Sequence, residues 1–250
     1  MAAFDINHAG GLAPAVPREG AGASPCSACS IRNLTICAPL NDIEQTQMAA
    51  IVTNIEQPPG TPLFDEGEPA DHVFNVTAGT IKVYKLLPDG RRQVTGFLFA
   101  GDFLGLANQD TYAYSAEAVT ACHLCRFPRR KLEDLMTRFP KVEQRLLNIA
   151  SNELAVAQEQ MLLLGRKTAR EKIASFLLLL AKRAQQRGQK DDSVSVPMSR
   201  TDIGDYLGLT TETVSRTFTQ LKKANLIRLL PNSQVELSQR AELEDIAGGF

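Results

Sequence analysis

The hydrophobic and polar positions change their period along the chain, and these changes divide its 250 residues into regions. Residues 1–25 are rich in Ala, Gly and Pro without any period, which predicts a disordered lead-in. Across residues 41–139, short alternating runs broken by turn residues predict an antiparallel β-roll. Two of these runs, residues 80–86 and 92–99, flank an Asp-Gly pair and therefore predict a hairpin.

A helical period begins at Pro140, since proline suits the first turn of a helix and not its interior. The helix expected over residues 140–165 has apolar positions spaced alternately by three and four residues, as in a coiled-coil seam. We expect this helix to pair with its copy in a homodimer, and packing on its own domain is the alternative. The expected dimer interface consists of Leu147, Ala150, Leu154, Ala157, Met161 and Leu164.

Residues 166–250 predict two short helices and a hairpin, the elements of a winged helix-turn-helix domain. Ser199 is a candidate cap for the first helix, and Thr210 or Thr211 for the second. One face of the helix pair is apolar and a different face of the second helix is polar. The expected fold class is thus α+β: an N-terminal antiparallel β-roll sensor domain, a long dimerisation helix and a C-terminal winged helix-turn-helix. The apolar face consists of Ile203, Leu207, Val214, Phe218 and Leu221.

The distribution of charge indicates what the C-terminal domain binds. Residues 1–165 contain 13 basic and 18 acidic residues, whereas residues 166–240 contain 14 and 7. A basic domain of this kind is typical of proteins that bind a polyanion. Arginine can donate two hydrogen bonds to guanine, and glutamate can accept one from cytosine, so the second helix suits double-stranded DNA. The expected DNA contacts are Thr211, Glu212, Ser215, Arg216 and Lys222.

The cysteines suggest a second kind of site. The N-terminus lacks the basic and apolar segments of a secretory signal, so we expect a cytoplasmic protein whose thiols are reduced. The sequence has no run of about 18 apolar residues that would span a membrane, so we expect no membrane partner. Cys26, Cys29 and Cys37 lie in one loop, residues 26–40, which can place three thiolates around a metal or cluster. The fourth ligand must come from elsewhere in the chain.

The segment "TACHLCRFP" offers Cys122, His123 and Cys125 as that ligand. If it is a strand, Cys122 and Cys125 point to opposite faces, and only one of them meets the loop. Four thiolates suit an iron–sulfur cluster as well as zinc, and a site of three cysteines and His123 also suits zinc. The spacing leaves these alternatives open. A thiol oxidoreductase or metal-dependent enzyme is less well supported, because the histidines are scattered along the chain.

Three features of the chain together resemble the Crp/Fnr superfamily over about residues 26–247, and in particular its Fnr branch with FnrN-like and FixK-like members. They are the cysteine set and the segments "TDIGDYLGLTTETVSRTFTQLKKANLI" and "GTIKVYKLLPDGRRQVTGFLFAGDFLGL". The match of "ETVSR" implies that Glu212, Ser215 and Arg216 read a palindrome resembling TTGAT-N4-ATCAA. The match of "CRFP" implies that Cys125 completes the ligand set and that Cys122 is an extra residue.

The resemblance further implies that Cys26, Cys29, Cys37 and Cys125 hold a [4Fe-4S] cluster, which oxygen degrades, and that the intact form is a DNA-binding homodimer. It also implies RNA polymerase as a partner. The cyclic-nucleotide branch uses an arginine to bind phosphate, and the stretch "GDFLGLANQDTYAYSAEA" contains none, so we expect no cyclic nucleotide. The expected function is an oxygen-sensing transcription regulator, not an enzyme. The same scaffold with zinc or redox thiols as its sensor is the alternative.

Overall fold

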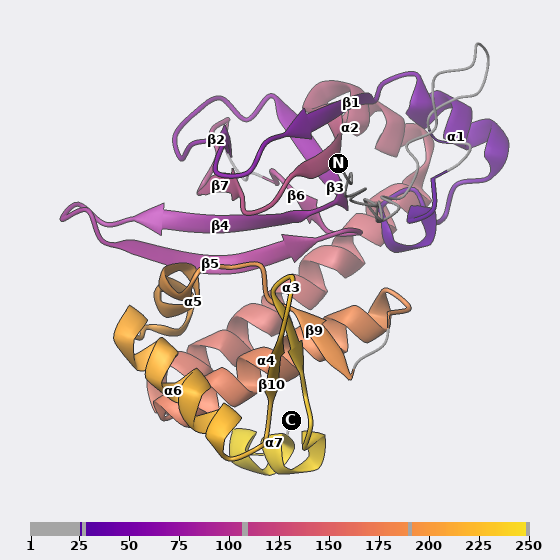
Figure 1. The fold of residues 1–250 in the computed structure, drawn as a ribbon. Coiled ribbons are helices and arrows are strands. Elements are labelled where there is room, and N and C mark those ends of the chain that lie inside the picture. Colours follow the sequence, from indigo (N-terminus) through magenta and orange to yellow (C-terminus); the bar gives the residue numbers. More distant parts are fainter. Residues whose placement is uncertain (1–25, 27–28, 107–109, 190–191, 249–250) are drawn as a thin grey trace, which may run out of the picture.

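The chain folds into a β-roll, a long helix beside it and a C-terminal unit of short helices with a small sheet (Figure 1). The computed structural model describes Cys26 and residues 29–106, 110–189 and 192–248. The expected disordered lead-in, residues 1–25, lies outside the described residues. The predicted α+β fold class is confirmed by the order of these elements.

Two four-stranded antiparallel sheets form the β-roll, with strand orders β1-β8-β3-β6 and β2-β7-β4-β5. The predicted hairpin is β4–β5, and Gly90 turns it with a φ of +85°, which a residue with a Cβ rarely adopts. The strands are β1 (Thr53–Gln57), β2 (Pro62–Phe64), β3 (His72–Ala78), β4 (Thr80–Leu86), β5 (Arg92–Phe99), β6 (Phe103–Leu104), β7 (Ser115–Ala118) and β8 (Cys122–Pro128).

Apolar side chains fill the interior of the roll. Phe64 stacks on Tyr112 with ring centroids 3.7 Å apart, and it also stacks on Phe74 at 5.9 Å. The Tyr112 hydroxyl donates a hydrogen bond to the His72 carbonyl oxygen at 2.8 Å, which satisfies its polar end. The space between the two sheets of the roll is therefore filled by a packed apolar core.

Four helices surround the roll and lead out of it. They are α1 (Asp42–Ala49), α2 (Arg129–Arg138), α3 (Pro140–Arg166) and α4 (Ala169–Gln186). The sequence prediction assigned residues 41–139 to the β-roll and missed α1. The local signal for α1 is a capping box, in which Asn41 and Glu44 satisfy each other's backbone N–H groups.

A second core, which we call the cysteine-side core, lies on the outer face of the sheet that contains β8. It consists of Ile36, Met48, Phe127, Leu135 and Val142, with several neighbours. These residues come from the cysteine loop, α1, β8, α2 and α3, and all are at most 1% exposed. The described residues of the cysteine loop form one 3-10 turn, Arg32–Leu34, and no other helix or strand, so this core holds the loop in place.

The C-terminal unit is the predicted winged helix-turn-helix. Ser199 caps the first helix of the motif and Thr210 the second, and Gly208 makes the turn with a φ of +63°. All five predicted apolar positions are at most 2% exposed. The wing has a third strand that the sequence prediction did not include. The elements are β9 (Ser193–Ser195), α5 (Arg200–Leu207), α6 (Thr211–Lys223), β10 (Arg228–Leu230), β11 (Gln234–Glu236) and α7 (Arg240–Ala247).

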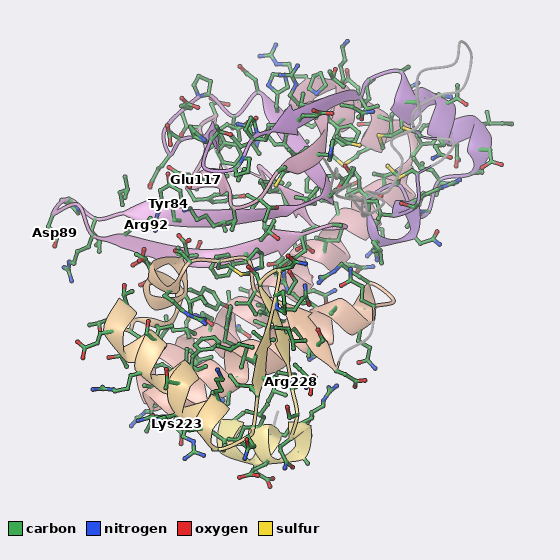
Figure 2. The ribbon with its side chains drawn as sticks, viewed as in Figure 1. Tyr84, Asp89, Arg92, Glu117, Lys223 and Arg228 are labelled. Atoms are coloured by element: carbon green, nitrogen blue, oxygen red, sulfur yellow. The ribbon has the colours of Figure 1, made fainter. Side chains whose placement is uncertain are left out.

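Buried and partly buried charges join the two units. We call them the junction cluster, which consists of Lys82, Arg92 and Glu117 of the roll with Asp202 and Asp205 of α5. Lys82 Nζ lies 2.8 Å from Glu117 Oε1 and 3.0 Å from Asp202 Oδ1. Arg92 contacts Asp202 and Asp205, each at 2.9 Å. Figure 2 shows Arg92 and Glu117 near the hairpin end of β4 and β5.

The pKa of the Asp202 carboxyl lies below its usual value. Burial raises this pKa, but hydrogen bonds from Ser199 and Lys82 and the charges of Lys82 and Arg92 outweigh that effect. Asp202 is thus a charged group that the two units share.

We expect Asp202→Ala to lower the free energy of unfolding by about 3–5 kcal/mol, because it leaves Lys82 buried with one partner fewer. Ser199→Ala is the matched control: it removes the same helix cap, costs about 1 kcal/mol, and leaves Lys82 paired. Urea unfolding of the full chain measures both. An equal loss in the two variants would show that Asp202 acts only as part of the cap.

Candidate functional site

The exposed face of α6 carries the side chains that the sequence predicted to contact DNA. Glu212, Ser215 and Arg216 are exposed, while Val214 and Phe218 on the other face are buried. The helix is fixed at its start because the Thr210 hydroxyl accepts a hydrogen bond from the Thr213 N–H at 3.1 Å. An anchored helix with one free polar face is the geometry of a recognition helix.

The polar groups of this face remain available for a ligand. Within the part of the chain that the structure describes, no ion pair engages Glu212, Arg216 or Lys222. Thr211 is also exposed, at the start of α6. Figure 2 shows Lys223 at the other end of α6, where basic side chains can meet phosphates. The roles of the five expected DNA contacts stay predictions.

The cysteines divide into two groups. All five are reduced thiols in the structure. Cys122 points into the roll, where its Sγ donates toward the carbonyl oxygens of Thr80 at 3.3 Å and Thr120 at 3.2 Å. Cys125 lies on the other face of β8 and packs against the cysteine-side core together with Cys37. Because side chains along β8 alternate between its two faces, Cys122 points away from the cysteine loop, as the sequence predicted for a strand.

The thiols of Cys26, Cys29, Cys37 and Cys125 lie close enough for their charges to interact. Burial raises the pKa of Cys125 to about 12, and the charges of Cys26, Cys37 and Cys29 act in the same direction. Burial likewise raises the pKa of Cys37 to about 11, with further contributions from Cys26 and Cys29, although a hydrogen bond to Thr35 lowers it. A thiolate without a compensating positive charge is therefore unfavourable at Cys37 and at Cys125.

In the described residues, no three His, Cys, Asp or Glu side chains lie close enough together to hold a metal ion, so the thiols do not form a preassembled metal site. The donor set nevertheless fits an iron–sulfur cluster, which is held by four cysteine thiolates. The alternative ligand His123 is half exposed, and its Nδ1 lies 3.5 Å from Glu56 Oε1.

Helix α3 exposes part of the expected dimer interface in the single chain. Leu147 and Leu154 are each 60% exposed and Met161 is 70% exposed, whereas Ala150 and Leu164 are partly buried and Ala157 is exposed. Burying such large apolar side chains against a second copy would be favourable. The dimer interface remains a prediction.

Two arginines that the sequence analysis missed connect α3 to its surroundings. Arg183 of α4 contacts Glu153 at 3.2 Å and Asp102 at 3.1 Å. Arg145 of α3 donates to the Leu34 carbonyl oxygen in the cysteine loop at 3.0 Å. The only sequence signal of either residue is a basic side chain on a helix, since their partners lie 30 to 111 positions away.

Two family models match the chain: the cyclic nucleotide-binding domain over residues 55–139 and the Crp-like helix-turn-helix domain over residues 171–246. The chain is 41% identical over 204 residues to the transcriptional activatory protein AadR of Rhodopseudomonas palustris, which covers 82% of this chain and 85% of that protein. The chain belongs to the Crp/Fnr family. The expected family is thereby confirmed.

Other Crp/Fnr relatives place the chain in the Fnr branch. The nitrogen fixation regulation protein FixK of Bradyrhizobium diazoefficiens is 38% identical over 222 residues, covering 89% of this chain and 93% of that protein. The solved structure of FixK2 from Bradyrhizobium japonicum has a TM-score of 0.73 at 37% identity, covering 78% of this chain and 97% of that one. The chain is a transcription regulator and not an enzyme. Among its described helices, none has the length and apolar character to cross a bilayer.

We expect Arg216→Ala to weaken operator binding by about 1–3 kcal/mol per half-site and to relax the preference at one G·C pair, because a bidentate contact to guanine is lost. Lys222→Ala is the control, and it should weaken binding to all sequences alike and reduce the salt dependence. Competition among single-base variants of TTGAT-N4-ATCAA measures both. Equal losses across the panel for Arg216→Ala would identify it as a phosphate contact.

Proposed function

We propose that this Crp/Fnr regulator senses oxygen through a [4Fe-4S] cluster held by Cys26, Cys29, Cys37 and Cys125. The observation that carries the proposal is that Cys37 of the cysteine loop and Cys125 of β8, 88 positions apart in the sequence, pack against the same core, and the charges of the three loop thiols help to raise the pKa of Cys125. The folding of the cysteine loop against the outer face of β8 places Cys37 and Cys125 on the same side of the sheet. When bound, the cluster supplies an iron–sulfur centre that reacts with oxygen.

Hydrogen bonds attach the cysteine loop to α1, which precedes the roll, and to α3, which follows it. Gln45 Nε2 of α1 donates to the Cys26 carbonyl oxygen at 2.6 Å. The Arg145 guanidinium of α3 donates to the carbonyl oxygens of Leu34 at 3.0 Å and Thr35 at 3.4 Å. A change in the loop therefore acts directly on the helix expected to form the dimer.

In the proposed active state, two copies pair through α3 and present two α6 helices to a palindrome resembling TTGAT-N4-ATCAA. Glu212, Ser215 and Arg216 read base edges, while Thr211 and Lys222 support them. Loss of the cluster in oxygen releases the cysteine loop, shifts α3 and moves the equilibrium toward monomer and away from DNA. The DNA-bound dimer then engages RNA polymerase.

The proposed regulator binds no cyclic nucleotide, although its β-roll matches the cyclic nucleotide-binding domain. Residues 101–118 contain no arginine to pair with a phosphate. The stacked rings of Phe64, Phe74 and Tyr112 already occupy the inside of the roll. The proposed sensor site therefore lies on the outer face of β8 and not inside the roll.

We expect Cys125→Ser to lose the cluster and Cys122→Ser to retain it, because only Cys125 faces the loop thiols. Cys26→Ser, Cys29→Ser and Cys37→Ser should behave like Cys125→Ser. Iron and sulfide are measured on protein purified without air, and the parent chain should be brown with about four of each.

Two results would contradict this assignment in different ways. Retention of the cluster by Cys125→Ser with its loss from Cys122→Ser would reverse the ligand set. A colourless parent chain that carries zinc on the same thiols would favour the alternative sensor.

We expect Leu154→Ala to weaken the dimer even with the cluster intact, because it removes a large apolar side chain from the seam. Leu162→Ala is the matched control: Leu162 is 67% exposed on the same helix but lies outside the seam, so the dimer should be unchanged. Sedimentation velocity at micromolar concentration, with and without air, measures the dimer fraction. An unchanged fraction after complete loss of the cluster would exclude switching by assembly.

A further inference from the structure

Among the buried side-chain nitrogen and oxygen atoms of the described residues, one has no hydrogen-bond partner, and it is Oδ1 of Asn75. Asn75 lies in the middle of β3 and is 1% exposed. A buried carboxamide oxygen without a partner lowers the stability of the fold, and folded proteins seldom contain one without a reason. The family model and the ligand motif do not account for this residue.

The strand register places Asn75 beside the proposed ligand Cys125. The two residues are directly opposite each other in the antiparallel pair β3–β8, so their side chains project from the same face of the sheet. The next residue on that face of β3, Val73, and the other cross-strand partner, Phe103, both belong to the cysteine-side core. The Asn75 side chain therefore faces the side of the sheet that the cysteine loop covers.

Cys125 has a second asparagine on its other side. Asn54 of β1 is its partner in the pair β1–β8, and the Cys125 Sγ donates toward Asn54 Oδ1 at 3.6 Å. Asn54 is exposed, so water can satisfy its carboxamide. Asn75 is likewise a cross-strand partner of Cys125, but it lies on the buried side, where water does not reach its Oδ1.

We propose that the Asn75 carboxamide donates a hydrogen bond to a sulfur of the bound cluster at Cys125. Rotation about the Cβ–Cγ bond exchanges Oδ1 and Nδ2, so the buried position can present an N–H donor. A thiolate or sulfide accepts that bond. This inference rests on the proposed iron–sulfur function, and it makes Asn75 a positioning residue rather than a ligand.

Such a bond has a measurable consequence for the cluster. Hydrogen bonds to the sulfurs are among the factors that set the reduction potential of an iron–sulfur centre. A donor stabilises the more negative, reduced state, so it raises the potential and disfavours oxidation. Asn75 should therefore slow the loss of the cluster in air, and its removal should shift the potential to more negative values.

Asn75→Val and Asn75→Thr form the test pair, because valine and threonine have nearly the same shape and only threonine keeps a donor. Ser115→Ala is the control: Ser115 is a buried polar residue of the other sheet, and its hydroxyl accepts from the Glu66 N–H at 2.9 Å. The full-length chains, purified without air, are compared by iron and sulfide content, reduction potential, iron–sulfur stretching bands in resonance Raman spectra, and rate of cluster loss in air.

We expect Asn75→Val to bind the cluster with a more negative potential, shifted stretching bands and a several-fold faster loss in air. Asn75→Thr should lie closer to the parent chain, and Ser115→Ala should match it. Without the cluster, the thermal midpoint of Asn75→Val should equal or exceed that of the parent chain, since an unpartnered polar atom is removed.

A cluster in Asn75→Val with the potential, bands and air sensitivity of the parent chain would overturn the inference while leaving the proposed function intact. A parent chain that takes up no iron and sulfide would instead refute the proposed function. If Asn75→Val fails to fold, Asn75→Ala takes its place, because alanine also lacks a donor: exchange into D2O should shift the stretching bands of the parent chain more than those of Asn75→Ala, and equal shifts would overturn the inference.

Discussion

The cysteine-side core is the packing on which the rest of the structure depends. Where the structure describes the cysteine loop, it has no strand and a single three-residue 3-10 turn, so its shape comes from burying Ile36 against β8, α2 and α3. The same core receives Val142 from the first turns of α3 and Phe127 from the end of β8. Because protein interiors are close-packed, a displacement of one of these segments requires the others to move. The position of the loop is thereby coupled to the position of α3.

A second set of contacts extends this coupling to the DNA-binding unit. Gln160 of α3 donates to the Tyr206 carbonyl oxygen at 2.9 Å, and Lys172 of α4 donates to the Leu207 carbonyl oxygen at 3.0 Å. The Tyr206 ring lies 5.2 Å from Phe97 of β5, and burial raises the pKa of its hydroxyl to about 12. Together with the junction cluster, these bonds fix α5 in one orientation, because a rotation would leave buried charges and carbonyl groups without partners. The recognition helix follows α5 after a single tight turn.

Local signals explain how much of this architecture could be predicted from the sequence. The start of α3 at Pro140, the caps at Ser199 and Thr210, and the hairpin turn at Gly90 all depend on residues within a few positions. Strand β9 and helix α1 were missed because they are short and gain stability from distant partners, although α1 also has its local capping box. Strand β9 is three residues long and exists because β11 pairs with it, and α1 is a short helix stabilised by the cysteine-side core. The hydrogen bond of Arg145 to the cysteine loop and the position of Asn75 opposite Cys125 follow only from the folded chain.

The candidate site could be predicted in part because strand β8 obeys a period of two. Pairing with β1 and β3 fixes its register, so Cys122 and Leu124 enter the roll while Cys125 faces outward. A slip of one residue would exchange the two faces, placing Leu124 toward the cysteine loop and Cys125 inside the roll. The aromatic packing inside the roll opposes that slip, because β3 must keep Phe74 inward for its stack with Phe64. The packed interior of the roll therefore maintains the register of β8 that places the Cys125 thiol on the outer face. The core of the β-roll thus stabilises the candidate site, although the site lies outside it.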